Sequence, residues 1–106
     1  MKVENQVTIE FMSKSVNEAY ARSAVASFAA QLDPTLEELG DIKTAVSEAV
    51  TNCIVHGYPD SIGMITMRCR ILPDHVLDIQ VKDKGKDDLH IVICSKSGVL
   101  AWHVPT

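Results

Sequence analysis

Hydrophobic and polar residues alternate along the first dozen residues of the chain. Val7, Ile9 and Phe11 fall on one side of an extended backbone, and polar residues occupy the positions between them. A repeat of two over this length predicts a half-buried β-strand over residues 5–12.

The pattern then changes to a helical repeat. Ser15 and Glu18 have the spacing of a capping box, in which side chains satisfy the free amides at a helix start. Asp33-Pro34 is expected to end the helix, because the residue before a proline is pushed out of the α region. The apolar residues in between recur every three or four positions and predict a buried stripe of Val16, Ala19, Tyr20, Ala24, Phe28 and Leu32.

A second capping box, Thr35 with Glu38, opens the most strongly periodic segment of the chain. We expect a helix that continues to His56, with Gly57 in the position that follows a helix end. Its predicted apolar stripe consists of Leu36, Leu39, Ile42, Val46, Ala49, Val50 and Cys53.

The second half of the chain returns to alternation. Residues 65–71 and 77–81 each alternate, and the turn signal Pro73-Asp74 lies between them, which predicts an antiparallel hairpin. A charged loop over residues 82–88 and short strands over 90–94 and 99–104 are expected to follow. One strand, two helices and three or four further strands indicate an α+β domain with its helices gathered on one face of the sheet.

Composition narrows the class of protein. The 106 residues predict one domain, and 46% hydrophobic with 23% charged residues is a globular composition. A net charge of −4 argues against a direct, non-specific nucleic-acid binder. No apolar run approaches the roughly 20 residues of a membrane span, and no signal peptide is evident. Three cysteines without a C-x-x-C pair favour reduced thiols and a cytoplasmic location.

Two segments carry candidate chemistry. Glu48 and Asn52 are four residues apart, so they share a helix face that is offset from the apolar stripe. A carboxylate beside a carboxamide suits Mg²⁺ or a base next to a ligand, although many surface helices carry such polar pairs. Asp83, two residues before Gly85, follows a predicted strand. Its carboxylate could accept a hydrogen bond from an amino group, or the segment could be an ordinary turn.

Together and in this order, the two segments resemble the GHKL (Bergerat) ATP-binding fold. The likeness is closest to bacterial anti-sigma factors that are also serine kinases, and it covers about residues 5–86. The segments that carry it are Gln31–Glu38, Asp41–Asn52 and Ile54–Tyr58. The resemblance implies a two-layer α+β sandwich whose sheet is mixed but mostly antiparallel.

The resemblance also implies roles for individual residues. Glu48 would take the proton from a substrate serine, and Asn52 would hold the Mg²⁺ that bridges the ATP phosphates. Asp83 would accept a hydrogen bond from the adenine amino group, with Gly85 shaping the loop beneath it. His56 would either line the pocket edge or be a helix C-terminal histidine favoured by the dipole.

The family's partners are proteins. Arg22 corresponds to an arginine that docks them, and a solvated arginine is the alternative. By resemblance the chain is a cytoplasmic homodimer that binds a sigma factor of RNA polymerase and phosphorylates a serine of an anti-anti-sigma factor with Mg-ATP. Residues 32–35 favour the sporulation branch of the family over the general-stress branch.

The last part of the chain departs from the family pattern. Asp87 stands where the second glycine of a D-x-G-x-G box is expected, and residues 88–106 supply no second glycine box. We therefore expect one incomplete domain over 1–106 that lacks the family's lid and last elements, with an atypical tail over 88–106. A frame change or truncation near residue 86 is favoured over a replacement tail. We expect the helices and sheet to fold and the kinase activity to be low or absent, because the lid is missing. A non-catalytic binding module and a chain that never folds are the alternatives.

Overall fold

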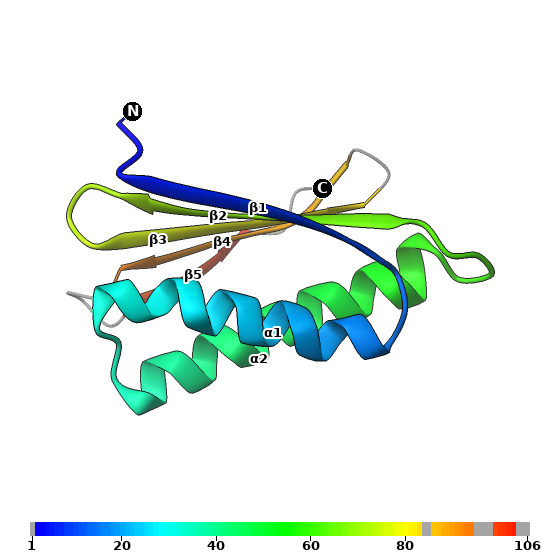
Figure 1. The fold of residues 1–106 in the computed structure, drawn as a ribbon, viewed down its shortest axis with the longest axis horizontal. Helices are drawn as coiled ribbons and strands as arrows, with labels where there is room; N and C mark the ends of the chain where they lie inside the picture. The colour runs from blue at the N-terminus through cyan, green and yellow to red at the C-terminus, as the bar shows by residue number, and fades with distance from the viewer. Residues whose placement is uncertain (1, 84–85, 95–98, 104–106) are drawn as a thin grey trace.

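The computed structural model describes the backbone of residues 2–83, 86–94 and 99–103 and the side chains of residues 2–83. A strand, two helices and four further strands follow one another (Figure 1). A 3₁₀ turn, η1, separates the helices, and a π turn, η2, follows the second helix. In chain order the elements are β1 (Asn5–Met12), α1 (Val16–Ala29), η1 (Ala30–Leu32), α2 (Leu36–Asn52), η2 (Cys53–Gly57), β2 (Met64–Leu72), β3 (Val76–Asp83), β4 (Lys86–Cys94) and β5 (Val99–His103).

The strands form one sheet in the order β1-β2-β3-β4-β5, and every pairing described is antiparallel. The expected hairpin is confirmed, with Cys69 opposite Ile79 in the β2–β3 register. The charged loop expected over residues 82–88 is wrong in its extent. β3 continues to Asp83 and β4 already begins at Lys86, with a register shift between Val81 and Lys82. Charged residues at this density are typical of a loop, but charge does not by itself prevent strand pairing.

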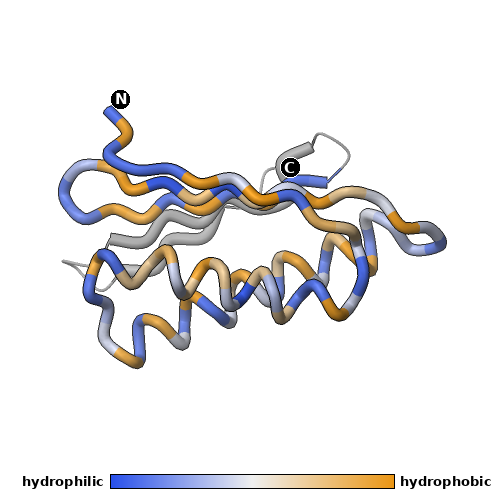
Figure 2. Tube along the Cα trace, in the orientation of Figure 1, coloured by the Kyte–Doolittle hydropathy of each residue, from blue (hydrophilic) through white to orange (hydrophobic). Residues whose placement is uncertain are grey.

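Both helices cover the same face of the sheet, so the molecule has the two layers that the sequence predicts (Figure 1). The apolar residues of β2 and β3 alternate along the strands and point toward the helices. Figure 2 shows the same alternation as bands of colour along these strands. The core between the layers includes the fully buried Val25, Val46, Val50, Ile65 and Ile79.

The buried stripe predicted for the first helix is confirmed at Phe28 and wrong in the first two turns of the helix. Val16 and Tyr20 are 73% and 56% exposed, whereas Ala21 and Val25 are fully buried. The buried side of α1 consists of Ala21, Val25, Phe28 and Ala29, and the larger apolar residues at its start remain outside the core. In α2 the predicted stripe is buried from Ile42 onward, but Leu36 in the first turn is exposed.

Only one of the two predicted capping boxes is present. The Thr35 hydroxyl accepts a hydrogen bond from the Glu38 amide at 3.1 Å, and the Glu38 carboxylate accepts one from the Thr35 amide at 2.8 Å. Ser15 makes no capping hydrogen bond. Its backbone is already helical, whereas a capping residue needs an extended conformation to turn its oxygen toward the free amides.

The long helix does not remain α-helical to His56, as was predicted. It ends at Asn52, and the next five residues form a π turn in which the Tyr58 amide donates to the Cys53 carbonyl at 3.1 Å. Gly57 is therefore not the glycine that follows a regular helix end. π turns are rare and often occur at functional sites, so this one bears on the site below.

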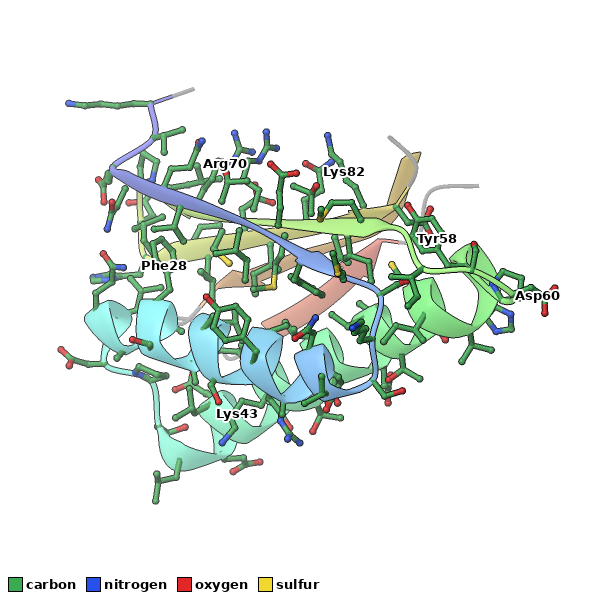
Figure 3. The ribbon with its side chains drawn as sticks, turned by 45° about the vertical axis from the view of Figure 1, so that its right-hand side comes forward. Phe28, Lys43, Tyr58, Asp60, Arg70 and Lys82 are labelled. Carbon is green, nitrogen blue, oxygen red and sulfur yellow. The ribbon has the colours of Figure 1, made fainter. Side chains whose placement is uncertain are left out.

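The face of the sheet that points away from the helices is polar. Arg70 on β2 lies directly opposite Asp78 on β3 and donates to its carboxylate oxygen Oδ2 from Nε at 2.8 Å and from a terminal nitrogen at 2.5 Å. Figure 3 shows Arg70 and Lys82 on this side. Asp78 and Gln80, two of the polar positions in the alternating pattern of β3, are nevertheless only 1% and 8% exposed.

In the part of the chain that the structure describes, no helix has the length and apolar character needed to cross a membrane.

Candidate functional site

The outer face of α2 holds Glu48 and Asn52 together, as their spacing predicts. Both residues are exposed, and both line a surface hollow of about 270 Å³ with Ser47 and Thr51. Buried residues of the same helix, such as Val46 and Val50, fix this face by packing against the sheet and α1. A carboxylate and a carboxamide oxygen therefore lie at one hollow on a rigid element.

A second hollow adjoins the first. It has a volume of about 320 Å³, and Glu48 and Ser47 line both hollows. Arg22 from α1 and Lys43 from α2 also border it, together with Gly40 and Thr44. Figure 3 shows Lys43 on the side of the helices that faces away from the sheet. The structure thus places Arg22, the predicted docking residue, beside the predicted base.

Glu18 joins the two helices at this point. It accepts a hydrogen bond from the Ser47 hydroxyl, and its other carboxylate oxygen lies 3.8 Å from the Arg22 guanidinium. The residue predicted to cap the first helix therefore bridges to α2 instead. Because Ser47 immediately precedes Glu48, this contact ties the position of Glu48 to that of Arg22.

Asp83 lies at the end of β3 and is only 6% exposed. The π turn contacts this strand and brings the Gly57 backbone against the Asp83 side chain. Asp83 does not line the hollow of Glu48 and Asn52. The structure therefore places the predicted adenine-binding carboxylate beyond the end of α2, next to the π turn rather than on the face that carries the predicted base.

His56 is exposed and belongs to the π turn, and it does not line the hollow of Glu48 and Asn52. The change from α to π geometry after Asn52 shifts His56 from the position one regular turn beyond it. Gly85, predicted to shape the loop beneath adenine, lies outside the described residues. The structure describes the backbone of Asp87 but not its side chain.

The side chains described fit a nucleotide-borne Mg²⁺ better than a resident metal. Among residues 2–83, no three His, Cys, Asp or Glu side chains gather in a way that could hold a metal ion. Mg²⁺ bound with a nucleotide needs only one or two protein oxygens, because phosphates and water complete its octahedron. The exposed amide oxygen of Asn52 can supply one such ligand.

Sequence reasoning missed three residues of this region. Lys43 gave no signal, because a lysine on a polar helix face is common. Glu18 was assigned to a capping box, although its spacing of four from Arg22 is also that of an ion pair. Gly57 was interpreted as a helix terminator, and only the tertiary structure shows what it touches.

Comparison with known proteins shows the family to which the chain belongs. The family model of the histidine kinase-like ATPase domain matches residues 11–91, which include both helices, β2, β3 and most of β4. The chain belongs to this family. The resemblance and the fold class predicted from the sequence are therefore confirmed.

Proteins named anti-sigma F factor are similar to this domain. The one from Caldanaerobacter subterraneus subsp. tengcongensis is 59% identical over 86 residues, which make up 81% of this chain and 59% of that protein. The one from Thermoanaerobacter sp. (strain X514) is 56% identical over 86 residues, with the same coverage. The one from Clostridium acetobutylicum is 53% identical over 83 residues, or 78% of this chain and 57% of that protein. The chain thus spans less than two thirds of the length of these relatives.

Proposed function

We propose that the chain is an anti-sigma factor whose histidine kinase-like ATPase domain phosphorylates a serine of an anti-anti-sigma factor with Mg-ATP. The observation that carries the proposal is the position of Glu48, which lines one hollow with Asn52 and the adjoining hollow with Arg22. A base in this position can reach a nucleotide on one side and a protein substrate on the other. The relatives named anti-sigma F factor support the same function.

Glu48 is the proposed general base. Its carboxylate accepts the proton of the substrate serine hydroxyl while the serine oxygen forms a bond to the γ-phosphorus of ATP. The bond from that phosphorus to the oxygen bridging the β- and γ-phosphates breaks, and ADP leaves with the electron pair. General-base assistance of this kind is worth roughly 10²- to 10⁴-fold in rate.

Asn52 and Asp83 are the proposed nucleotide contacts. The Asn52 amide oxygen would supply one ligand to the Mg²⁺ that accompanies ATP, and the bound ion would supply positive charge next to the phosphates. The buried Asp83 carboxylate accepts a hydrogen bond from the adenine amino group, and this contact selects adenine over bases that lack a donor there. His56 at the pocket edge and Gly85 beneath the base remain proposed secondary contacts.

Arg22 is the proposed docking residue for protein partners. It is 42% exposed at its side chain, it borders the hollow of Glu48, and Lys43 adds a second cation there. Such a patch suits an acidic partner surface. We propose a sporulation sigma factor as the inhibited partner, a homodimer as the working form and the cytoplasm as the location. Regulation of a general-stress sigma factor is the alternative within the same class.

Phosphoryl transfer tests the proposal directly. The chain is incubated with γ-labelled ATP, Mg²⁺ and the anti-anti-sigma factor of a related anti-sigma F system, and label on the partner's serine is counted. We expect slow but detectable transfer by the parent chain, a loss of about a hundredfold or more in Glu48→Gln, and no change in Glu37→Gln, an exposed glutamate in the first turn of α2.

A parent chain that folds and transfers no label would contradict the kinase proposal. Capture of a sporulation sigma factor by that chain, with Glu48→Gln capturing it equally well, would then identify a non-catalytic binding module. A general-stress sigma factor captured in its place would assign the chain to the other branch.

A further inference from the structure

Gly57 lies in closer contact with Asp83 than any other residue type would allow. A methyl group on Gly57 would lie 2.7 Å from Cγ of Asp83 and closer still to Oδ2, which is well inside van der Waals contact. Asp83 has little room to retreat, because it is 6% exposed at the end of a paired strand. Any side chain at residue 57 must therefore move the Asp83 carboxylate or the π turn.

The need for glycine at this position is steric and not conformational. The Gly57 backbone lies outside the left-handed region, where glycine is favoured for its freedom of φ. The residue that closes the π turn, Tyr58, has φ −132° and is not left-handed either. The absent side chain, rather than an unusual backbone angle, is what the fold uses at residue 57.

We propose that Gly57 is a positioning residue for the adenine subsite, because its missing side chain determines where the Asp83 carboxylate lies. The inference rests on the proposed role of Asp83 in adenine binding. A carboxylate recognises a single amino group only if one of its oxygens lies within hydrogen-bond distance of the donor and in line with it. A displacement of about 1 Å is enough to lose that contact, so the π turn after Asn52 acts through Asp83 on base selection.

The chain contains a matched control for this effect. Gly40 lies in α2, and a methyl group there would meet nothing within 4 Å. Gly40→Ala therefore makes the same chemical change as Gly57→Ala without a steric consequence. Gly40 borders the proposed docking hollow and not the adenine subsite, so Gly40→Ala is expected to leave the nucleotide preference unchanged and to stabilise the helix slightly.

The test compares ATP with purine riboside triphosphate, which lacks the adenine amino group. Both are titrated with Mg²⁺ into the 106-residue chain, and binding is followed by NMR, which measures even millimolar dissociation constants. We expect the parent and Gly40→Ala to prefer ATP by about tenfold or more, the value of a hydrogen bond to a charged acceptor. We expect the preference to fall to near one in Gly57→Ala and in Asp83→Ala.

A second measurement does not depend on the nucleotide. In urea unfolding, Gly57→Ala should lower the urea concentration at the midpoint when it is made in the parent chain. It should lower that midpoint much less when it is made in an Asp83→Ala chain, because the clashing carboxylate is then absent. Equal effects in both backgrounds, or a folded Gly57→Ala that keeps the full preference for ATP, would overturn the inference. A parent chain without any preference would instead contradict the proposed role of Asp83, and with it the role of Gly57 in base selection.

Discussion

The Ser47 hydroxyl on α2 donates a hydrogen bond to the Glu18 carboxylate on α1. Both side chains are partly buried, so the bond is better shielded from water than a surface contact. Glu18 also pairs with Arg22 at 3.8 Å, but that pair is more exposed and lies within one helix. The hydrogen bond between the helices is therefore the stronger of the two contacts that Glu18 makes.

Removing this contact should destabilise the domain, and the losses caused by the two single substitutions should not add up in the double variant. Ser47→Ala and Glu18→Ala should each lower the free energy of unfolding by about 1–2 kcal/mol, and the double variant by clearly less than the sum. Arg22→Ala should cost only about 0.5 kcal/mol, as exposed pairs four residues apart do. Urea unfolding of the parent, the two single variants and the double variant measures the coupling, and unfolding of Arg22→Ala measures the exposed pair. Strictly additive losses in the double variant would show that the hydrogen bond contributes nothing.

The two predicted capping boxes give a second test. Thr35→Ala should lower the free energy of unfolding by about 1 kcal/mol, because it removes the acceptor for the Glu38 amide. Ser15→Ala should cost no more than a few tenths of a kcal/mol, since Ser15 is exposed and makes no capping hydrogen bond. Thermal unfolding of both variants compares them, and equal losses would mean that Ser15 caps α1 in solution.

Stability at high pH should depend on Cys69. Burial, with the nearby Asp78 carboxylate as a second cause, raises the pKa of the Cys69 thiol from 9.0 to about 12. Above pH 9 the thiol ionises in the unfolded chain but not in the folded one, so protons are bound more tightly by the native state. The free energy of unfolding should therefore fall as pH rises from about 9 toward 12, by up to about 1.4 kcal/mol per unit.

Urea unfolding between pH 8 and pH 10.5 measures this slope. Cys69→Ala should be less stable than the parent at pH 8 but should lose stability less steeply above pH 9. Val46→Ala, a truncation at a buried position that cannot ionise, should keep the slope of the parent. If Cys69→Ala and the parent have the same slope, another group is responsible.

Much of the fold could be predicted from the sequence because its signals are local. The strand over residues 5–12, the Thr35 capping box and the β2–β3 hairpin each depend on spacings that neighbouring residues reveal. The Ser15 and Thr35 boxes have the same spacing and differ in outcome. Ser15 has a helical backbone, and the Glu18 side chain accepts a hydrogen bond from Ser47 on another helix instead. Tertiary contacts of this kind leave no local signal.

In the candidate site, too, the local relationships could be predicted and the tertiary contacts could not. Glu48 and Asn52 could be placed together from a spacing of four within one helix. The position of Arg22 beside Glu48 and of Gly57 against Asp83 could not, because each depends on how two distant elements pack. The π turn was missed because its apolar pattern continues that of the helix before it.

The Mg²⁺ dependence of ATP binding in Asn52→Ala tests most directly whether Asn52, on the outer face of α2, takes part in binding Mg-ATP. ATP is titrated with and without Mg²⁺ into the parent, Asn52→Ala and Asn5→Ala, whose altered residue lies on β1. We predict that Mg²⁺ tightens ATP binding about tenfold or more in the parent and in Asn5→Ala, and by little in Asn52→Ala. An Asn52→Ala chain that folds and keeps the full effect of Mg²⁺ would contradict the proposed role of Asn52.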